Sequence, residues 1–414
     1  MKNYILNIFK ENLIIKISFF FILAFPILLL LGSAILNTSI FMMNILFLIH
    51  IFYEKKLKIF NNDVFYLLIA IWVFFIINAL LNNNFSENYS RSFGFLRFIL
   101  LVFSFSYFVS YKNNQFKKFI FNIWTIIFII ISLDLIFELI FGFNTFGFKS
   151  PFPGRLTGFM GDELKIGHWY LCFSLIILSN NFNNHRKFYF LLLLIIAISF
   201  FIGERANFIR LTIAIVFLLL ITRRLSFKSL GGLVIMCIIV FNYTDNNNYY
   251  KARYMQQIKN AFKHNSLKEM NENNEYTPMY INAYNLFKDN KFLGVGLGSY
   301  YKKSHEKFNK TNNIINGYRV LPNTHPHQHH FEIMATLGLP GYILILSFLF
   351  YFFKKNLHFY KLNRQTINLS SSLMILVFFI PFLPTGSFFT TYGATIFWLN
   401  FSLMNLGNIK NIDY

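Results

Sequence analysis

The chain has 414 residues, of which 55% are hydrophobic, 20% are aromatic and only 13% are charged. Soluble globular proteins carry roughly a quarter charged residues, so most of the surface of this protein cannot face water. The composition excludes a soluble enzyme, a disordered chain and a protein with a single membrane anchor. It predicts an all-α, polytopic membrane protein.

The formal net charge of +21 would also suit a protein that binds nucleic acid. The basic residues, however, lie in short loops between apolar runs, so we expect them to orient the chain in a membrane and expect no nucleic-acid partner. Cys172 and Cys237 both lie inside apolar runs. The sequence therefore predicts neither a disulfide framework nor a thiolate metal site, and no cofactor is expected.

Apolar runs of about 15 to 23 residues recur along the whole chain, and a membrane-spanning helix needs about 20 residues. We predict twelve transmembrane helices, with eleven or thirteen as the alternatives. They are Ile17–Leu36, Ser39–Tyr53, Asp63–Leu81, Gly94–Tyr111, Phe119–Phe141, Leu164–Ser179, Phe188–Ile202, Asn207–Ile221, Ser229–Tyr243, Phe331–Phe353, Ile367–Leu383 and Phe388–Leu406.

The basic residues between these runs predict the orientation of the chain, because cytoplasmic loops are enriched in Lys and Arg. With the N-terminus in the cytoplasm, the inward loops hold nineteen basic residues. The short outward loops hold only Arg91, Lys149, Arg155 and Arg205. The alternation holds along the chain and predicts that both termini are cytoplasmic.

One polar segment interrupts the apolar runs and divides the chain into residues 1–243, a loop over residues 244–330 and residues 331–414. A loop of that length without structure is uncommon in a compact fold. The apolar spacing predicts helices within Tyr249 to Lys268 and Thr277 to Asn290, so we expect a helical cap on the outer face. A second outward loop, Gly142 to Glu163, is rich in Gly, Pro and Phe and could re-enter the bilayer.

A run of histidines directly precedes the tenth predicted span. His325, His327, His329 and His330 fall within six residues. A histidine at a membrane surface can act as a general base, because its ordinary pKa lies close to neutrality. The run could also bind a metal, although its spacing is not that of a common zinc site, or be an incidental turn. All three interpretations remain open from the sequence.

A five-residue outward turn contains Glu204 and Arg205. Charged residues in so short a connection at a bilayer are costly unless they are paired or used. The two could pair with each other or contact lipid headgroups, or Arg205 could bind a phosphate through bidentate hydrogen bonds. Arg210, one turn further along the same helix, could reach outward or face the same cavity.

A glycine-rich stretch before the sixth span carries Arg155, Asp162, Glu163 and Lys165. The acids could bind a substrate or simply occupy the first turn of the next helix, where the helix dipole favours negative charge. Arg253 lies in the predicted cap, where a solvated basic helix face is the default. These sites share one side of the membrane, which suits a lipid-linked pyrophosphate donor: arginines would neutralise the leaving group and a histidine would accept a proton.

The sequence His327-Gln328, followed by nine residues and Gly338, resembles the H-[NSQ]-x9-G signature of the O-antigen ligase and polymerase superfamily. The resemblance extends from about Gly154 to Tyr342. Further segments that fit are Gly203-Glu204-Arg205, Gly154-Arg155-Leu156-Thr157-Gly158, Gly161-Asp162-Glu163 and Phe292-Leu293-Gly294-Val295-Gly296-Leu297-Gly298.

The resemblance implies a metal-independent glycosyltransferase of the bacterial inner membrane that acts at the periplasmic face. Members transfer a glycan from undecaprenyl diphosphate to the lipid A core, or extend the glycan. It implies that His327 is the base and that the arginines bind the diphosphate, namely Arg205, Arg253 and Arg155. Supporting roles fall on His325, Gln328, Glu163, Arg210 and Gly338. Tyr276 lies in a segment where many relatives carry a further arginine.

We expect an O-antigen ligase, whose partners are an undecaprenyl-diphosphate-linked glycan, the lipid A core and membrane lipids. An O-antigen or capsule polymerase and a protein O-oligosaccharyltransferase would use the same chemistry on the same scaffold. A flippase for lipid-linked sugars is an alternative from another class. Its site would be expected near the middle of the bilayer, whereas the ionisable residues of this chain gather at the outer face.

Overall fold

The computed structural model describes residues 11–82, 85–111, 116–161, 163–224, 242–256 and 266–406, with the single positions 231, 234, 238 and 240. These residues are almost entirely helical. The two short strands β1 (Ile314–Ile315) and β2 (Tyr318–Arg319) form the one sheet among them, an antiparallel pair. The expected helical fold is confirmed.

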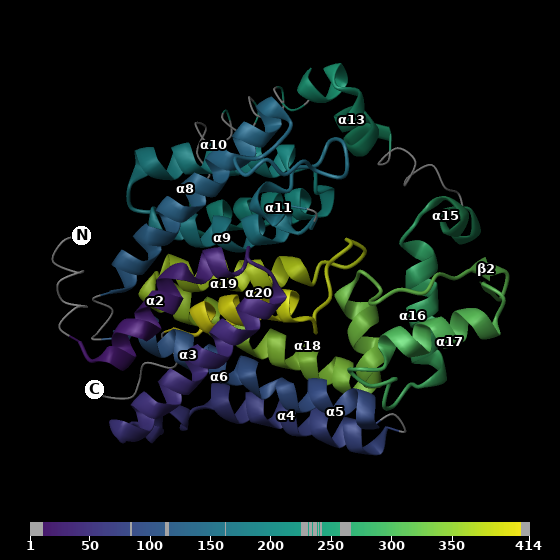
Figure 1. Cartoon of the computed structure of the whole chain (residues 1–414), viewed down its shortest axis with the longest axis horizontal. Coiled ribbons are helices and arrows are strands. Elements are labelled where there is room, and N and C mark those ends of the chain that lie inside the picture. Colours follow the sequence, from purple (N-terminus) through teal and green to yellow (C-terminus); the bar gives the residue numbers. More distant parts are fainter. Residues whose placement is uncertain are drawn as a thin grey trace.

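The long helices lie side by side in one bundle (Figure 1). In chain order they are α2 (Leu13–Leu28), α3 (Ser33–Tyr53), α4 (Asp63–Leu81), α5 (Phe85–Gly94), α6 (Leu96–Val109), α8 (Lys117–Phe141), α9 (Ile166–Asn180), α10 (His185–Phe201), α11 (Arg205–Ile221), α18 (His329–Asn363), α19 (Thr366–Phe378) and α20 (Thr391–Met404). Short 3-10 helices, η1 (Leu57–Phe60) and η2 (Gly158–Met160), lie in the connections.

All the predicted spans except the ninth coincide with helices of this bundle. The ninth, Ser229–Tyr243, falls largely outside the described residues. Helices long and apolar enough to cross a membrane are Ser33–Tyr53, Asp63–Leu81, Asn88–Val109, Lys117–Phe141 and His329–Asn363, and shorter apolar helices accompany them. They indicate a membrane protein, while the count of twelve spans and the division at residues 243 and 330 stay predictions.

Two predicted boundaries are wrong. The break between the first two helices lies at residues 29–32, because Gly32 adopts a left-handed conformation with φ of +96° before α3 begins. The sequence predicts that break between Leu36 and Ser39. The predicted span Ile367–Leu383 is too long, because α19 ends at Phe378 and the following residues form a loop.

Proline inside α2 is accommodated by indole groups from neighbouring helices. Pro26 has no N–H, so the carbonyl of Ile22 loses its helical partner. The indole of Trp124 on α8 donates to this carbonyl at 2.9 Å, and Trp169 on α9 donates to the Pro26 carbonyl at 2.8 Å. Backbone groups in a membrane must find such partners within the protein, so these contacts hold α2 against α8 and α9.

The centre of the bundle is formed by α6, α9, α19 and α20, which are buried along nearly their whole lengths. Small polar side chains connect them, as is common between membrane helices. The Ser106 and Ser402 hydroxyls lie 2.8 Å apart, and Asn368 donates to the Met404 carbonyl at 2.8 Å. The outer helices α2, α3, α4, α8 and α18 expose large apolar side chains, as a lipid-facing surface requires.

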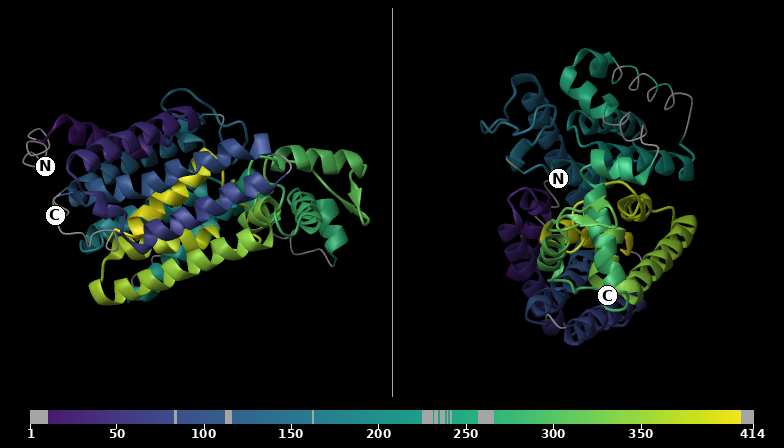
Figure 2. Two further views of the ribbon diagram at one scale, coloured as in Figure 1. Left: turned by 90° about the horizontal axis from the view of Figure 1, so that it is seen from below. Right: turned by 90° about the vertical axis from the view of Figure 1, so that its right-hand side faces the viewer.

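The polar segment forms a cap at one end of the bundle (Figure 2). It contains α13 (Asn248–Tyr250), the π-helix η3 (Lys251–Gln256), α15 (Leu267–Asn273), α16 (Thr277–Asp289), α17 (Tyr300–Lys310) and the two strands. The start of α2 and the end of α20 lie at the opposite end (Figure 2). The second predicted cap helix agrees with α16. The first, Tyr249 to Lys268, is divided among α13, η3 and α15, and residues 257–265 lie outside the description.

A loop of the cap, residues 291–299, is fixed to the bundle by backbone contacts with α18. Val295 and Gly296 donate to the carbonyls of Ala335 and Thr336 at 2.8 and 2.9 Å. Gly338 interrupts α18 with φ of +69°, and a Cβ there would lie 2.4 Å from the Phe292 oxygen. Glycine is thus required at position 338 by both the conformation and the close approach of the loop.

Helices α4 and α5 hold the other side of the same loop. Asn78 donates to the Leu293 carbonyl at 2.7 Å, and Arg91 donates to the Leu297 carbonyl at 3.2 Å. The Asn88 carboxamide oxygen accepts from the Gly298 N–H at 2.8 Å. The cap is therefore anchored to three helices beside the residues that precede α18.

Candidate active site

Three arginines come together where the loop before α9, the start of α11 and the cap meet. Arg155 belongs to the loop, Arg205 is the first residue of α11 and Arg253 lies in η3. Gly154 and Gly203 allow this approach, since both have positive φ. A Cβ on Gly203 would lie 2.1 Å from the Gly154 oxygen, so only glycine lets the two segments meet.

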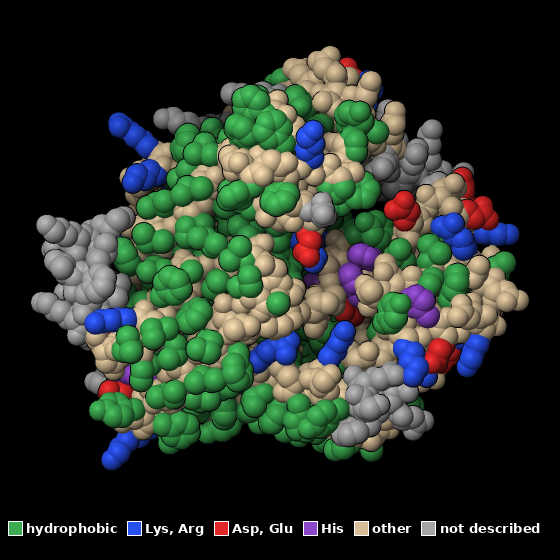
Figure 3. All heavy atoms as spheres, in the orientation of Figure 1, with side chains coloured by type: hydrophobic (Ala, Val, Ile, Leu, Met, Phe, Trp, Pro, Cys, Tyr) green, Lys and Arg blue, Asp and Glu red, His purple; other side chains and the backbone are tan. Residues whose placement is uncertain are grey.

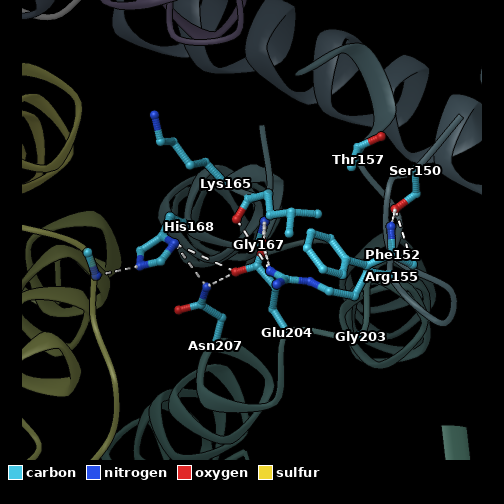
Figure 4. Close-up of polar contacts among 12 residues, drawn as sticks. Ser150, Phe152, Arg155, Thr157, Lys165, Gly167, His168, Gly203, Glu204 and Asn207 are labelled. Atoms are coloured by element: carbon cyan, nitrogen blue, oxygen red, sulfur yellow. Dashed lines mark hydrogen bonds and ion pairs between the residues drawn. The ribbon is translucent and has the colours of Figure 1, made fainter. Parts of the chain in front are cut away.

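Arg155 is held by Glu204, the acid of the turn before α11 (Figure 4). Its guanidinium lies 3.4 Å from the Glu204 carboxylate and also donates to the Leu164 carbonyl at 3.4 Å, while its buried Nε has no partner among the described residues. The pairing of Glu204 with Arg205, one alternative from the sequence, is wrong: Glu204 pairs with Arg155 instead. Burial raises the pKa of Glu204, and Arg155 opposes that shift.

Arg253 donates two hydrogen bonds to one backbone carbonyl, that of Gly203, at 3.1 and 2.9 Å. Burial lowers its pKa, and the neighbouring positive charges of Arg155 and Arg205 lower it further. The three guanidiniums are therefore close enough to repel one another. Such a cluster is stabilised by an anion, and a diphosphate has the matching charge.

The Arg205 guanidinium makes no hydrogen bond or ion pair to any residue that the structure describes. It is partly buried, and the groups that affect it electrostatically include Tyr254, Tyr276 and Arg155. A charged group that is partly buried without a partner is costly. Arg205 is thus available for a ligand, unlike the other two arginines of the cluster.

His327 lies beside Tyr276, and the centroids of the two rings are 5.6 Å apart. The backbone of His327 is left-handed with φ of +54°, and a hydrogen bond with the Thr385 backbone opposes the lowering of the imidazole pKa by burial. The imidazole of His325 lies 4.2 Å away, centroid to centroid. Burial lowers the pKa of His327. Burial also lowers the pKa of His325 to about 3, and the neighbouring His327 and Lys165 contribute to this lowering. Both are neutral at pH 7, as a base must be.

The remaining members of the histidine run are structural. Gln328 caps α18 by accepting from the Phe331 N–H at 3.0 Å. His329 is buried among Phe378, Phe379 and Phe388. His330 is within hydrogen-bond distance of the Tyr342 hydroxyl and the Phe379 carbonyl. His325 and His327 are the two members placed beside the arginine side of the site.

The other predicted supporting residues do not reach the arginine cluster. Arg210 is fully buried and donates to the Val377 carbonyl, the Leu383 carbonyl and Asn207. Glu163 is exposed and pairs with Lys165 at 2.7 Å. Gly338 serves the docking of the cap loop. Asp162 lies outside the described residues.

Two side chains that sequence reasoning missed lie next to Glu204, which binds Arg155. His168 on α9 and Asn207 on α11 lie 3.1 Å apart, and Asn207 also donates to Glu204 at 2.5 Å (Figure 4). His168 is one turn from the glycine-rich stretch, and a polar residue at the start of an apolar run was the available signal. Tyr276 was noted only as a departure from relatives, although its ring contacts His327.

A recess opens beside the cap, bordered by histidine, basic and acidic side chains (Figure 3). Much of the bundle surface around it is apolar (Figure 3). Within the part of the chain that the structure describes, no three His, Cys, Asp or Glu residues are grouped as metal ligands would be. The arrangement can bind an anionic lipid headgroup at a membrane edge and place a neutral imidazole next to it.

Residues 188–346 match the family model for O-antigen ligase. This match confirms the resemblance to the O-antigen ligase superfamily. It includes Arg205, Arg253, His327 and Gly338, whereas Arg155 precedes it. No protein with a curated description matches the chain. The match and the apolar helices together indicate a membrane protein related to O-antigen ligases, for which lipid-linked glycans are the expected class of substrate.

Proposed function

We propose that this protein is a glycosyltransferase of the O-antigen ligase type. It transfers a glycan from undecaprenyl diphosphate to a hydroxyl of the lipid A core oligosaccharide, without a metal. The observation that carries the proposal is the Arg205 guanidinium, which has no partner among the described residues and belongs to a cluster of three arginines, with Tyr276 near both Arg205 and the His327 imidazole.

The arginines bind the diphosphate of the donor. Arg205 supplies the guanidinium that has no protein partner, while Arg155 and Arg253 add fixed positive charge on either side. As the bond between the sugar C1 and the phosphate oxygen breaks, negative charge grows on the departing diphosphate. Preorganised donors stabilise such charge more in the transition state than in the ground state. The cluster therefore lowers the barrier to departure of the lipid diphosphate.

His327 accepts the proton of the acceptor hydroxyl. The oxygen of that hydroxyl forms the new bond to C1 of the donor sugar, and the proton moves to the imidazole. Because attack comes from the face opposite to the leaving diphosphate, the anomeric configuration is inverted. The depressed pKa of His327 keeps the imidazole unprotonated at neutral pH, and the proton leaves to water after each transfer.

The protein would lie in the bacterial inner membrane with both termini in the cytoplasm and the cap in the periplasm. The excess of basic residues in the inward loops supports this orientation. The cap lies at the end of the bundle opposite the start of α2 and the end of α20. In this arrangement the donor headgroup enters the site from the outer leaflet.

Deletion of the gene, with complementation by variants and gel analysis of surface glycolipids, tests the proposal. A ligase deletion leaves bare lipid A core while undecaprenyl-linked long chains accumulate. Wild type restores ligated chains and His327→Ala does not. His305→Ala is the control, because His305 is a half-buried cap histidine whose imidazole contacts Tyr301 of its own helix. A core that carries single repeat units identifies a polymerase instead, and loss of glycan from proteins identifies a protein O-oligosaccharyltransferase.

A further inference from the structure

The loop between α19 and α20 is held by hydrogen bonds from several other elements. Residues 383–388, named the 383–388 loop below, follow α19 without regular structure. From α11, Arg210 donates to the Leu383 carbonyl at 2.9 Å. From α18, the Glu332 carboxylate accepts from the Ser387 hydroxyl and from the Phe388 N–H, the latter at 2.7 Å. Both ends of the loop are thereby fixed.

The middle of the 383–388 loop holds the backbone of the candidate base. The Thr385 N–H donates to the His327 carbonyl at 2.7 Å. His327 has a positive φ of 54°, which costs about 1 kcal/mol or more for a residue with a Cβ and persists only where surrounding contacts determine it. The direction of the His327 side chain therefore depends on where Thr385 lies.

The next residue of the loop is bound by His168. The Gly386 N–H donates to Nε2 of His168 at 3.3 Å. The other ring nitrogen, Nδ1, lies 3.1 Å from the Asn207 amide and 3.6 Å from the Glu204 carboxylate. Glu204 in turn binds Arg155 and precedes Arg205 directly. The imidazole of His168 is thus a physical link between the arginine side of the site and the loop that holds His327.

We propose that His168 is a positioning residue, which fixes the 383–388 loop and thereby the distance between the His327 imidazole and the arginine cluster. This inference rests on the proposed function. His168 touches neither donor nor acceptor in this scheme; it acts through Gly386 and Thr385. Misplacement of a reacting group by about 1 Å can lower a rate about 100-fold, so losing one such support has a measurable effect.

Substitution of His168 is expected to affect the transfer step but not the binding of the donor. The arginines stay in place without His168, because Arg253 and Arg155 keep their bonds to Gly203 and Glu204. Affinity for the diphosphate should then be unchanged. The transfer step should slow, because the base is no longer held at its working distance.

Two substitutions at this position and one at a distant histidine test the proposal. His168→Leu removes the acceptor for Gly386, whereas the side-chain oxygen of His168→Gln can occupy the Nε2 position and restore it. His50→Leu is the control: His50 is a buried histidine whose Nε2 lies 2.8 Å from the Tyr107 hydroxyl, and within the described residues it makes no hydrogen bond to the 383–388 loop, whereas His168 is partly exposed.

Transfer is measured in cells as the rate at which ligated glycolipid appears, normalised to folded protein in the membrane. Binding is measured on the purified full chain with undecaprenyl diphosphate as the probe. We expect a fall of about 10- to 100-fold in transfer for His168→Leu, a Kd within twofold of wild type, and most of the rate restored in His168→Gln. The His50→Leu control should transfer at the wild-type rate.

The proposal is overturned if His168→Leu transfers as fast as wild type, if His168→Gln is as slow as His168→Leu, or if His50→Leu is equally slow. It is also overturned if His168→Leu loses undecaprenyl diphosphate binding, which would indicate general damage. His327→Ala in the same assays separates the two proposals. If His327→Ala still transfers glycan, the proposed function is contradicted. If His327→Ala is inactive but His168→Leu transfers at the wild-type rate, only the positioning role is contradicted.

Discussion

The arginine side of the candidate site and its histidine side are built alike. On each side, the predicted reactive group, Arg205 or His327, forms no hydrogen bond with another side chain among the described residues, and a neighbour of the same type in the sequence is used to build the protein. Arg210 binds two carbonyls and Asn207, and His330 lies against Tyr342 and Phe379. Residue type and proximity in sequence therefore do not identify the reactive group. The hydrogen bonds that each side chain makes distinguish Arg205 from Arg210 and His327 from His330 as candidates.

The largest expected effect comes from comparing two histidines of the run. His327→Ala should lower the rate of glycan transfer about 100- to 10,000-fold, the usual contribution of a general base, without changing the melting temperature. His330→Ala should lower the melting temperature and leave the transfer rate unchanged, because it removes contacts to Tyr342 and Phe379 but no group of the site. Transfer in membranes and thermal unfolding of the purified proteins measure both. Equal loss of transfer in the two variants would contradict the comparison.

The two arginines of α11 provide the next test. Arg205→Ala should lower transfer about 100- to 1,000-fold, as the loss of one preorganised donor does, and should weaken binding of undecaprenyl diphosphate. Arg210→Ala should instead lower the free energy of unfolding by about 2–3 kcal/mol, because buried carbonyls lose a charged donor. If Arg205→Ala lowers the melting temperature as much as Arg210→Ala does, Arg205 has a structural role.

The pH dependence of transfer tests the protonation state of His327. A base must be unprotonated, so lowering the pH through its pKa removes activity, by about tenfold per pH unit. Burial lowers that pKa below its ordinary 6.5, so the rate should stay constant from pH 8 to about 6.5 and fall at lower pH. A rate that does not fall as the His327 imidazole becomes protonated, in protein that is still folded, is incompatible with the base role.

The smallest effect is expected at the anchor of the cap. Gly338→Ala places a Cβ 2.4 Å from the Phe292 oxygen at a positive φ and should lower the free energy of unfolding by about 1–3 kcal/mol. Gly142→Ala is the control, since Gly142 has φ of +78° but open space around it. Gly142→Ala should lower the free energy of unfolding by about 1 kcal/mol. Equal melting temperatures for the two variants would show that the loop does not need Gly338.

The sequence predicted the helices well because apolar runs are continuous and their polar boundaries are sharp. α4 begins and ends at the predicted Asp63 and Leu81. Boundaries failed where an apolar run continues through a turn, as at Gly32, or into a loop, as after Phe378. In both places the backbone changes direction among residues that remain apolar, so hydropathy contains no signal of the change.

The sequence predicted which residues are candidates for the site, but not the contacts that join them. Arg205 and His327 could be selected because the sequence predicts each at an outward membrane edge, where an ionisable group is costly without a use. The pairing of Glu204 with Arg155, the burial of Arg210 and the link through His168 depend on contacts between distant segments. His168 and Gly386, for example, are separated by 218 positions. No local pattern encodes such a contact.

The anchoring of the cap loop also affects how the protein is made. Asn78 and Leu293 are 215 positions apart, and Asn88 and Gly298 are 210 apart. The amides of α4 and α5 are therefore synthesised and inserted long before the backbone that satisfies them, and they must wait while the intervening helices enter the membrane. A chain arrested before residue 291 would leave these amides without the backbone groups that satisfy them. Docking of the 291–299 loop on α4 and α5 is thus a late step in the assembly of the chain.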